Sequence, residues 1–190
     1  MGDEPVDSTL LGLLGELKAL TRIQKGESAL SLQYIANFPI KSDNTYYQVD
    51  AIVVCTKGIF CLEVKNWSCI VTCSSSVYWT AKYPTEEIKV KSPISQNVAH
   101  RDRLERMLGY NVASYVLFSG STTLINNPDN VLNTNAFIPL LRTLPDQLSK
   151  QKIQSIMNTL GSYKRAIEPE MLVDFVFKQV SSKKVKRGKS

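Results

Sequence analysis

The sequence predicts a mixed α/β or α+β fold in which a central β-sheet is flanked by helices. Apolar runs of strand length gather at residues 31–67 and 111–119. Segments with helical periodicity lie before, between and after these runs. The 190 residues, 43% of them hydrophobic, suit one domain with a buried core.

The N-terminal elements follow from helical spacing and a polar turn. Residues 7–25 are predicted to form a helix, because leucines recur there at helical spacing, at Leu10, Leu13, Leu17 and Leu20. A first strand is expected at 31–40, and the polar stretch 41–45 is expected to be a turn.

A central hairpin is predicted from two strands, at 46–55 and 59–67. With a loop of two or four residues, Val54 pairs with Ile59, and counting back places Asp50 opposite Glu63. A loop of three residues would shift the register and separate the two carboxylates. Lys65 shares a face with Glu63, because side chains alternate along a strand.

The later elements are predicted from caps and apolar runs. A second, more exposed hairpin is expected at 69–82. The next helix begins with Ser92 as cap and Pro93 in its first position, and it ends at Gly109. The remaining chain is expected to form a strand at 111–119, a loop at 120–134, a short strand at 135–141, and helices at 145–163 and 170–180.

The charge and the cysteine content limit which partners and which metal sites are expected. The formal net charge of +6 is compatible with nucleic acid or an anionic membrane surface as partner, although charge alone is weak support. The four cysteines form no CxxC pair, so no zinc site is expected. We expect reduced thiols in a cytoplasmic protein, with no signal peptide and no membrane-spanning helix.

Asp50, Glu63 and Lys65 are charges in otherwise apolar strands, where charge is costly to bury. Two facing carboxylates repel each other unless a proton or a cation offsets the repulsion. Hard oxygen ligands suit Mg²⁺ or Mn²⁺, and a nearby lysine suits phosphodiester hydrolysis. The alternative is a solvated strand face that carries a cross-strand charge pair.

Four sequence segments resemble the nuclease-related domain called NERD, a branch of the PD-(D/E)XK nuclease superfamily. They are "GLLGE" ending at Glu16, "VDAIVV" with Asp50, "GIFCLEVKNW" with Glu63 and Lys65, and "SPISQNVAH" with Gln96 and His100. Their order and spacing agree with the family across residues 10–118.

The resemblance implies a restriction-endonuclease-like core and metal-dependent cleavage of DNA. Asp50 and Glu63 would bind Mg²⁺ or Mn²⁺, and the carbonyl of Val64 would be a further ligand. Lys65 would be the catalytic lysine, while Gln96 and Glu16 would complete the site. Without the resemblance, Glu16 is as well explained as a solvated helix carboxylate.

Gln96, His100 and Arg103 share one face of the helix that Pro93 begins. Gln96 lies in the first turn, where phosphate binds favourably. His100 and Arg103 are candidate substrate contacts, although a packed histidine and a solvated arginine explain them equally simply. Trp67, Tyr78 and Trp79 are expected to pack in the core or cover the sheet edge, and the alternative is that they stack on bases.

The sequence therefore predicts a NERD-like nuclease domain at 8–142, a C-terminal helical extension that packs on it at 143–181, and a basic flexible tail at 182–190. The predicted function is a Mg²⁺- or Mn²⁺-dependent deoxyribonuclease. The alternatives are a nucleic-acid-binding module with the same fold and no activity, and an interaction protein whose hairpin docks to a partner. The form of the nucleic acid and the formation of a homodimer are left open.

Overall fold

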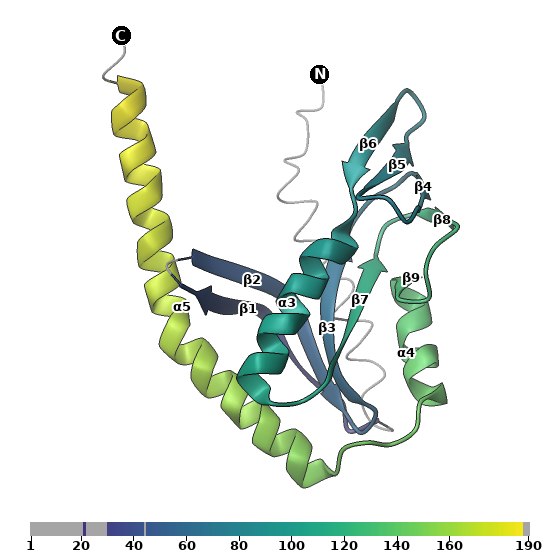
Figure 1. Ribbon diagram of the computed structural model, residues 1–190, viewed down its shortest axis with the longest axis vertical. Coiled ribbons are helices and arrows are strands. Elements are labelled where there is room, and N and C mark those ends of the chain that lie inside the picture. Colours follow the sequence, from purple (N-terminus) through teal and green to yellow (C-terminus); the bar gives the residue numbers. More distant parts are fainter. Residues whose placement is uncertain (1–20, 22–29, 44, 188–190) are drawn as a thin grey trace.

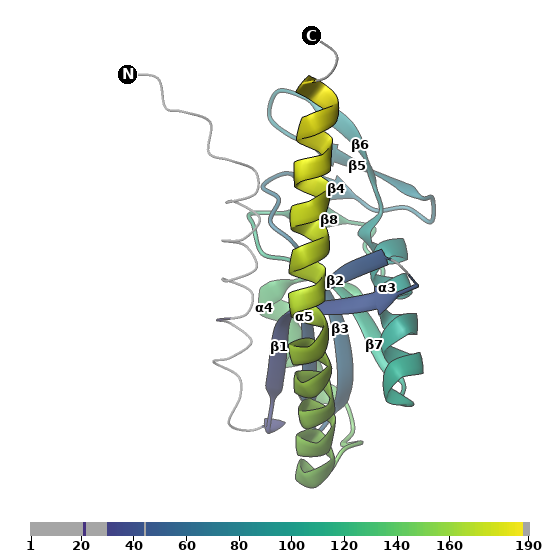
Figure 2. The same ribbon diagram turned by 90° about the vertical axis from the view of Figure 1, so that its left-hand side faces the viewer.

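The computed structural model describes residues 21, 30–43 and 45–187. This part of the chain forms two mixed β-sheets with three helices of defined bounds (Figures 1 and 2). The predicted mixed α/β class is therefore confirmed. The N-terminal helix predicted at 7–25, which contains Glu16, lies outside the described residues apart from Thr21.

The larger sheet has five strands in the order β1-β2-β3-β7-β9. The first three are paired antiparallel, and β7 is parallel to both of its neighbours, β3 and β9. The sheet is mixed because the chain leaves β3 and returns to β7 through a long crossover. The strand bounds are β1 Gln33–Ser42, β2 Thr45–Cys55, β3 Gly58–Lys65, β7 Val112–Phe118 and β9 Val131–Asn133.

The hairpin of β2 and β3 has the register that the sequence predicts. Val54 pairs with Ile59, and Ile52 pairs with Cys61. The connection consists of Thr56 and Lys57, and Gly58 follows with a positive φ of 135°. A side chain would be strained in that conformation, so this glycine helps to fix the turn and hence the register.

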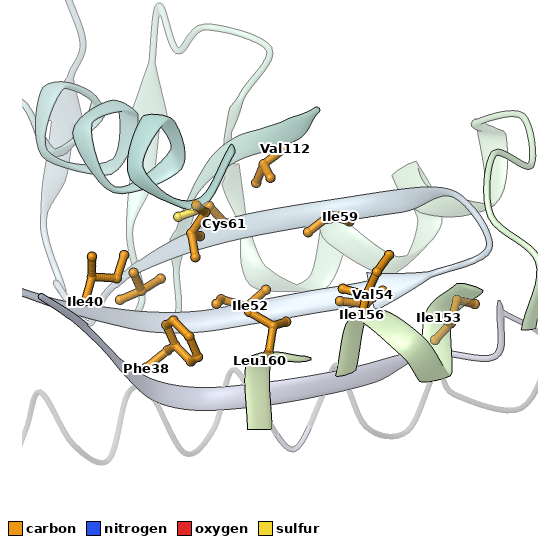
Figure 3. Packing of buried hydrophobic residues seen from close by; sticks show 12 residues of the cluster. Phe38, Ile40, Ile52, Val54, Ile59, Cys61, Val112, Ile153, Ile156 and Leu160 are labelled. Atoms are coloured by element: carbon orange, nitrogen blue, oxygen red, sulfur yellow. The ribbon is translucent and has the colours of Figure 1, made fainter. Parts of the chain in front are cut away.

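Helices cover both faces of the five-stranded sheet. On one face, Ile52 and Val54 pack against Ile153, Ile156 and Leu160 of helix α5 (Lys150–Arg187), as Figure 3 shows. The opposite face packs against helix α4 (Thr134–Thr143) and contains the alternate residues of β2, Ala51 and Val53. Because β2 is apolar on both faces, it is a buried central strand rather than a surface strand.

Helix α3 (Pro93–Leu108) has the predicted start and end. The Oγ of Ser92 accepts a hydrogen bond from the Ile94 N–H, and Pro93 stands where no intrahelical donor is needed. Gly109 ends the helix in the left-handed conformation, with φ 70°. Leu104 packs this helix on the same sheet face as α5.

A smaller sheet of four strands has the order β6-β5-β4-β8. Its strands β4, β5 and β6 precede α3 in the crossover, whereas β8 follows β7. The predicted second hairpin corresponds to β4 and β5, but the chain adds β6, which the sequence analysis did not predict. Trp79 is buried between this sheet and Phe118 of β7, so it packs in the core. The bounds are β4 Ile70–Thr72, β5 Tyr78–Lys82, β6 Glu87–Lys91 and β8 Thr123–Ile125.

The prediction of a strand at 135–141 is wrong, because this segment belongs to α4. Thr134, Phe137 and Leu141 are buried, and Ile138 packs beside them, which is helical spacing. A short apolar run does not distinguish a strand from a buried helix turn. The stretch predicted as a loop at 120–134 likewise contains β8, β9 and the first residue of α4.

The two helical stretches predicted at 145–163 and 170–180 belong to one helix, α5, except that residues 145–149 precede it and are not helical. Pro169 lies inside the helix. This helix is joined to β1 by polar contacts as well as by its apolar face. Lys41 forms an ion pair with Glu170 at 2.6 Å, and Lys164 donates a hydrogen bond to the carbonyl oxygen of Ala36 at 2.7 Å. The long helix therefore packs along the antiparallel edge of the sheet.

The four cysteines lie in the interior of the protein. Cys55, Cys61, Cys69 and Cys73 are all buried and have free thiols. In the part of the chain that the structure describes, no helix combines the length and the apolar character needed to cross a membrane.

Candidate active site

The β2–β3 ladder ends where the predicted acidic residues begin. The backbone register runs as far as Ala51 and Leu62. At the next residue of β2, Asp50, the side chain makes the contact to β3: its Oδ2 accepts a hydrogen bond of 2.7 Å from the main-chain N–H of Val64. Asp50 is thereby held beside the end of β3, next to Glu63.

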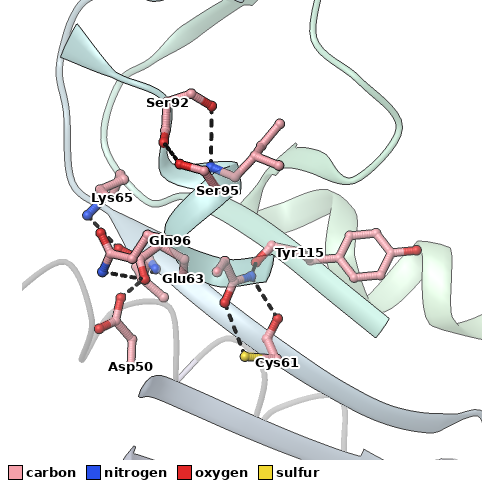
Figure 4. Close-up of polar contacts among 11 residues, drawn as sticks. Asp50, Cys61, Glu63, Lys65, Ser92, Ser95, Gln96 and Tyr115 are labelled. Atoms are coloured by element: carbon pink, nitrogen blue, oxygen red, sulfur yellow. Dashed lines mark hydrogen bonds and ion pairs between the residues drawn. The ribbon is translucent and has the colours of Figure 1, made fainter. Parts of the chain in front are cut away.

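Glu63 is a buried carboxylate with a partner on each oxygen. Its side chain is only 1% exposed. Oε1 lies 2.6 Å from Nζ of Lys65, and Oε2 accepts a hydrogen bond of 3.2 Å from Nε2 of Gln96 (Figure 4). The contact between Glu63 and Lys65 agrees with the predicted shared face, and a buried charge of this kind needs such compensation.

Asp50 and Glu63 influence each other electrostatically. Burial and, second, the charge of Glu63 raise the pKa of Asp50 from 3.8 to about 6, although the Val64 N–H and Lys65 act in the opposite direction. Two carboxylates in one partly buried place repel, and a proton or a cation relieves that repulsion. The pair is therefore near in space, as the hairpin register predicts.

Helix α3 is fixed to the sheet by Asn97, the residue after Gln96. Asn97 is fully buried, and its Nδ2 donates to the carbonyl oxygens of Cys61 at 3.0 Å and Tyr115 at 2.8 Å. Its Oδ1 accepts from the Cys61 thiol at 3.1 Å. These bonds join α3 to β3 and β7, and so they hold Gln96 within reach of Glu63.

A cavity of about 590 Å³ opens beside these residues at the N-terminal end of α3. Its wall contains three of the predicted residues in addition to Lys65, namely Gln96, His100 and Arg103. The remaining lining is partly aromatic and partly basic, with Tyr47, Trp67 and Lys91 among the residues. The first turn of α3 has no acidic residue, so its N-terminal dipole is not neutralised locally.

Two side chains in the cavity wall have polar atoms without a partner among the described residues. Nδ1 of His100 and Nε of Arg103 are both buried and make no hydrogen bond there. The Arg103 guanidinium lies 4.0 Å from the centre of the Tyr47 ring. Burial, and then the positive charges of Arg103 and Lys65, lower the pKa of His100, so the imidazole is neutral near pH 7.

The part of the chain that contains the candidate site matches a known protein family. A family model described as "Nuclease-related domain" (NERD) matches residues 11–119. The chain belongs to the NERD family. The resemblance noted in the sequence across residues 10–118 is thus confirmed. Neither the curated proteins nor the solved structures yield a match.

Membership in the NERD family implies a nuclease-related function and a nucleic acid as the substrate. The match includes β1 to β7 and α3, and therefore every described residue of the candidate site. It ends before α4 and α5 begin.

The acidic residues of this NERD chain fit a hard divalent cation. No group of three or more histidine, cysteine or acidic side chains converges within the described ranges. Mg²⁺, however, needs only one or two carboxylates, because water completes its shell. Asp50 and Glu63 supply two, and their mutual repulsion is what a cation would relieve.

Asn97 and Tyr47 were not predicted as residues of this site. Asn97 could have been noticed, because asparagine is a poor residue for a helix interior and stands one position after Gln96. Tyr47 gives no such signal, since its contact with Arg103 joins segments that are far apart in the chain. Glu16 lies outside the described residues, and the ligand role of the Val64 carbonyl stays a prediction.

Proposed function

We propose that this NERD protein is a metal-dependent nuclease that hydrolyses DNA phosphodiester bonds through Asp50, Glu63 and Lys65. The supporting observation is the grouping of these side chains with Gln96 at the end of β3, beside a cavity at the start of α3 (Figure 4). The proposal includes a restriction-endonuclease-like core within residues 8–142, with 143–181 as a helical extension and 182–190 as a basic tail, although α5 continues into that tail as far as Arg187.

The two carboxylates would hold Mg²⁺ or Mn²⁺, with the carbonyl of Val64 as a further ligand. When bound, such a cation activates water and stabilises the negative charge that develops on the phosphoryl group. The Val64 N–H fixes one oxygen of Asp50, so the other oxygen is left to face a ligand. Glu16 is proposed as an additional acidic residue of the same site.

Lys65 and Gln96 orient Glu63 from two sides. The Lys65 side chain is 27% exposed; its ammonium contacts Glu63, and the residue also lines the cavity. In that position it would hold the attacking water and stabilise the anionic transition state. Gln96 donates to the second oxygen of Glu63 and so acts as a positioning residue.

The cavity is proposed as the place where the scissile phosphate and its sugar bind. The start of a helix favours phosphate, because its free N–H groups and its dipole point there. His100 and Arg103 are proposed as substrate contacts because both line this cavity, although the nitrogens without a partner among the described residues are buried, so reaching a substrate needs a side-chain movement.

A binding module without activity is the second candidate, and one observation favours it. Both oxygens of Glu63 already have protein partners, Lys65 and Gln96, so a cation must share or displace these contacts. The protein would then keep a basic surface for nucleic acid without cleaving it.

A plasmid assay separates the two candidates. Supercoiled DNA is incubated with the protein and Mn²⁺ or Mg²⁺, with and without a chelator. Nicking that requires the metal and disappears in Glu63→Gln supports the enzyme, provided that Glu86→Gln, the same change at an exposed carboxylate, retains it. Retardation of DNA on a gel without any product supports the binding module.

A further inference from the structure

The outer face of the smaller sheet is basic. In β5, Trp79 and Ala81 are buried against the core, so Tyr78, Thr80 and Lys82 point to the opposite side. In the β5–β6 ladder, Lys91 pairs with Tyr78 and Lys89 pairs with Thr80. Lys82, Lys89 and Lys91 therefore share the outer face, and all three are exposed.

The side chains of these three lysines have no polar partner within the described part of the chain. Within the described residues, none of the three makes an ion pair or a side-chain hydrogen bond, although Glu87 stands opposite Lys82 in the ladder. Lys89 and Lys91 are two residues apart on one strand, which is about 7 Å. Lys82 and Lys89 are diagonal neighbours, which lie roughly 7–8 Å apart. Because Glu87 lies on the same face, three lysines and one carboxylate leave a formal charge of +2 to attract an anionic polymer.

This face is continuous with the candidate active site. Lys91 is the last residue of β6 and also lines the cavity that contains Lys65 and Gln96. The chain passes from Lys91 through Ser92 directly into α3, and Figure 1 shows β6 leading into the upper end of that helix. A strand of nucleic acid bound in the cavity can thus extend over the lysines without leaving the surface.

We propose that the outer face of β5 and β6 is a docking surface for the phosphate backbone of the nucleic acid that flanks the cavity. Charge complementarity is the reason for choosing this partner, because three neighbouring lysines match consecutive phosphates. The inference rests on the proposed function, since it names where that same substrate continues beyond the scissile bond.

The test compares two double variants, both in a Glu63→Gln background that prevents cleavage. K82Q/K89Q removes two charges from the proposed surface and leaves the cavity residues intact. R142Q/K150Q removes two exposed charges near α4 and the start of α5, at the other end of the molecule in Figure 1. Affinity for a fluorescein-labelled DNA duplex is measured by anisotropy over a range of salt concentrations, and thermal unfolding verifies that each variant is folded.

We expect K82Q/K89Q to bind about tenfold more weakly at moderate salt and to lower the slope of log affinity against log salt by about 2. The control pair should change affinity by less than about twofold. Unchanged affinity and slope in K82Q/K89Q, or an equal loss in both pairs, would overturn the proposal. Unchanged affinity and slope in K82Q/K89Q are expected if these lysines only protect an edge strand from pairing, or if the face binds a protein partner.

The outcome is independent of the plasmid assay. Lysine-dependent binding without metal-dependent nicking would refute the nuclease and support the surface. Nicking together with wild-type affinity in K82Q/K89Q would support the nuclease and refute the surface.

Discussion

The carboxylate of Asp50 accepts a 2.7 Å hydrogen bond from the main-chain N–H of Val64, the residue that separates Glu63 from Lys65. This bond replaces the backbone ladder at the point where β2 and β3 stop pairing. It holds Asp50 beside the buried Glu63, and the resulting repulsion contributes to the raised pKa of Asp50.

The affinity for Mn²⁺ should depend on pH through Asp50. Its pKa of about 6 means that the carboxyl gains a proton below that pH, and the proton competes with the cation. Titration calorimetry between pH 5 and 7.5 should therefore show affinity falling towards about tenfold per pH unit below pH 6. Asp50→Asn should bind Mn²⁺ weakly at every pH. Affinity independent of pH across this range would contradict the assignment.

The same carboxyl should influence the stability of the metal-free protein in the opposite sense to an ordinary salt-bridged aspartate. Its pKa is raised by folding, so the folded state binds the proton more tightly than the unfolded state. The contribution of Asp50 to the free energy of unfolding is therefore largest below pH 3.8 and is lost as the pH rises to about 6. When the free energy of unfolding in urea is plotted against pH, wild type and Asp50→Asn should differ in slope within this window. Parallel plots would argue against the raised pKa of Asp50.

Lys65→Met should lower nuclease activity by about 10²–10³-fold, because the ammonium that stabilises developing charge is removed. The affinity for Mn²⁺ should be maintained or should rise, since Glu63 loses its cationic competitor at 2.6 Å. Lys150→Met makes the same change at an exposed position and should have no effect. Calorimetry and plasmid nicking measure the two quantities separately. Full activity in Lys65→Met would exclude a catalytic role for this lysine.

Asn97→Ala should destabilise the protein by about 2–4 kcal/mol, because the buried carbonyl of Cys61 and the partly buried carbonyl of Tyr115 lose their donor. The catalytic side chains are unchanged, but Gln96 loses its fixed distance from Glu63. Nuclease activity should therefore fall at temperatures where the variant is still folded. Asn158→Ala, at an exposed position of α5, should change the free energy of unfolding by less than about 0.5 kcal/mol. A stable and fully active Asn97→Ala would show that α3 is held by other contacts.

Leu160→Ala tests whether the first part of α5 belongs to the core. Leu160 is fully buried against the β1–β2 face, so its truncation should cost about 2–5 kcal/mol in urea unfolding. Leu172 is on the same helix but is 57% exposed, and Leu172→Ala should be nearly neutral. Similar small effects of both changes would indicate a helix that is only loosely attached.

The sequence by itself determined the hairpin and the helix that follows it. The register of β2 and β3 depends on a short turn with Gly58 and on alternation within one hairpin, and both are local. The bounds of α3 depend on Ser92, Pro93 and Gly109, which act within one turn of each helix end. Asp50, Glu63 and Lys65 were consequently predictable as one group, because the turn of a hairpin alone sets which residues of its two strands lie opposite each other.

Tertiary structure decided the rest. Gln96 reaches Glu63 because the crossover through the smaller sheet returns α3 to the face of β3, and Asn97 fixes it there with bonds to two strands. Residues 135–141 form a helix because buried positions there match a helical face. Such contacts join segments that are 18 to 36 residues apart, so their energy is absent from any local pattern.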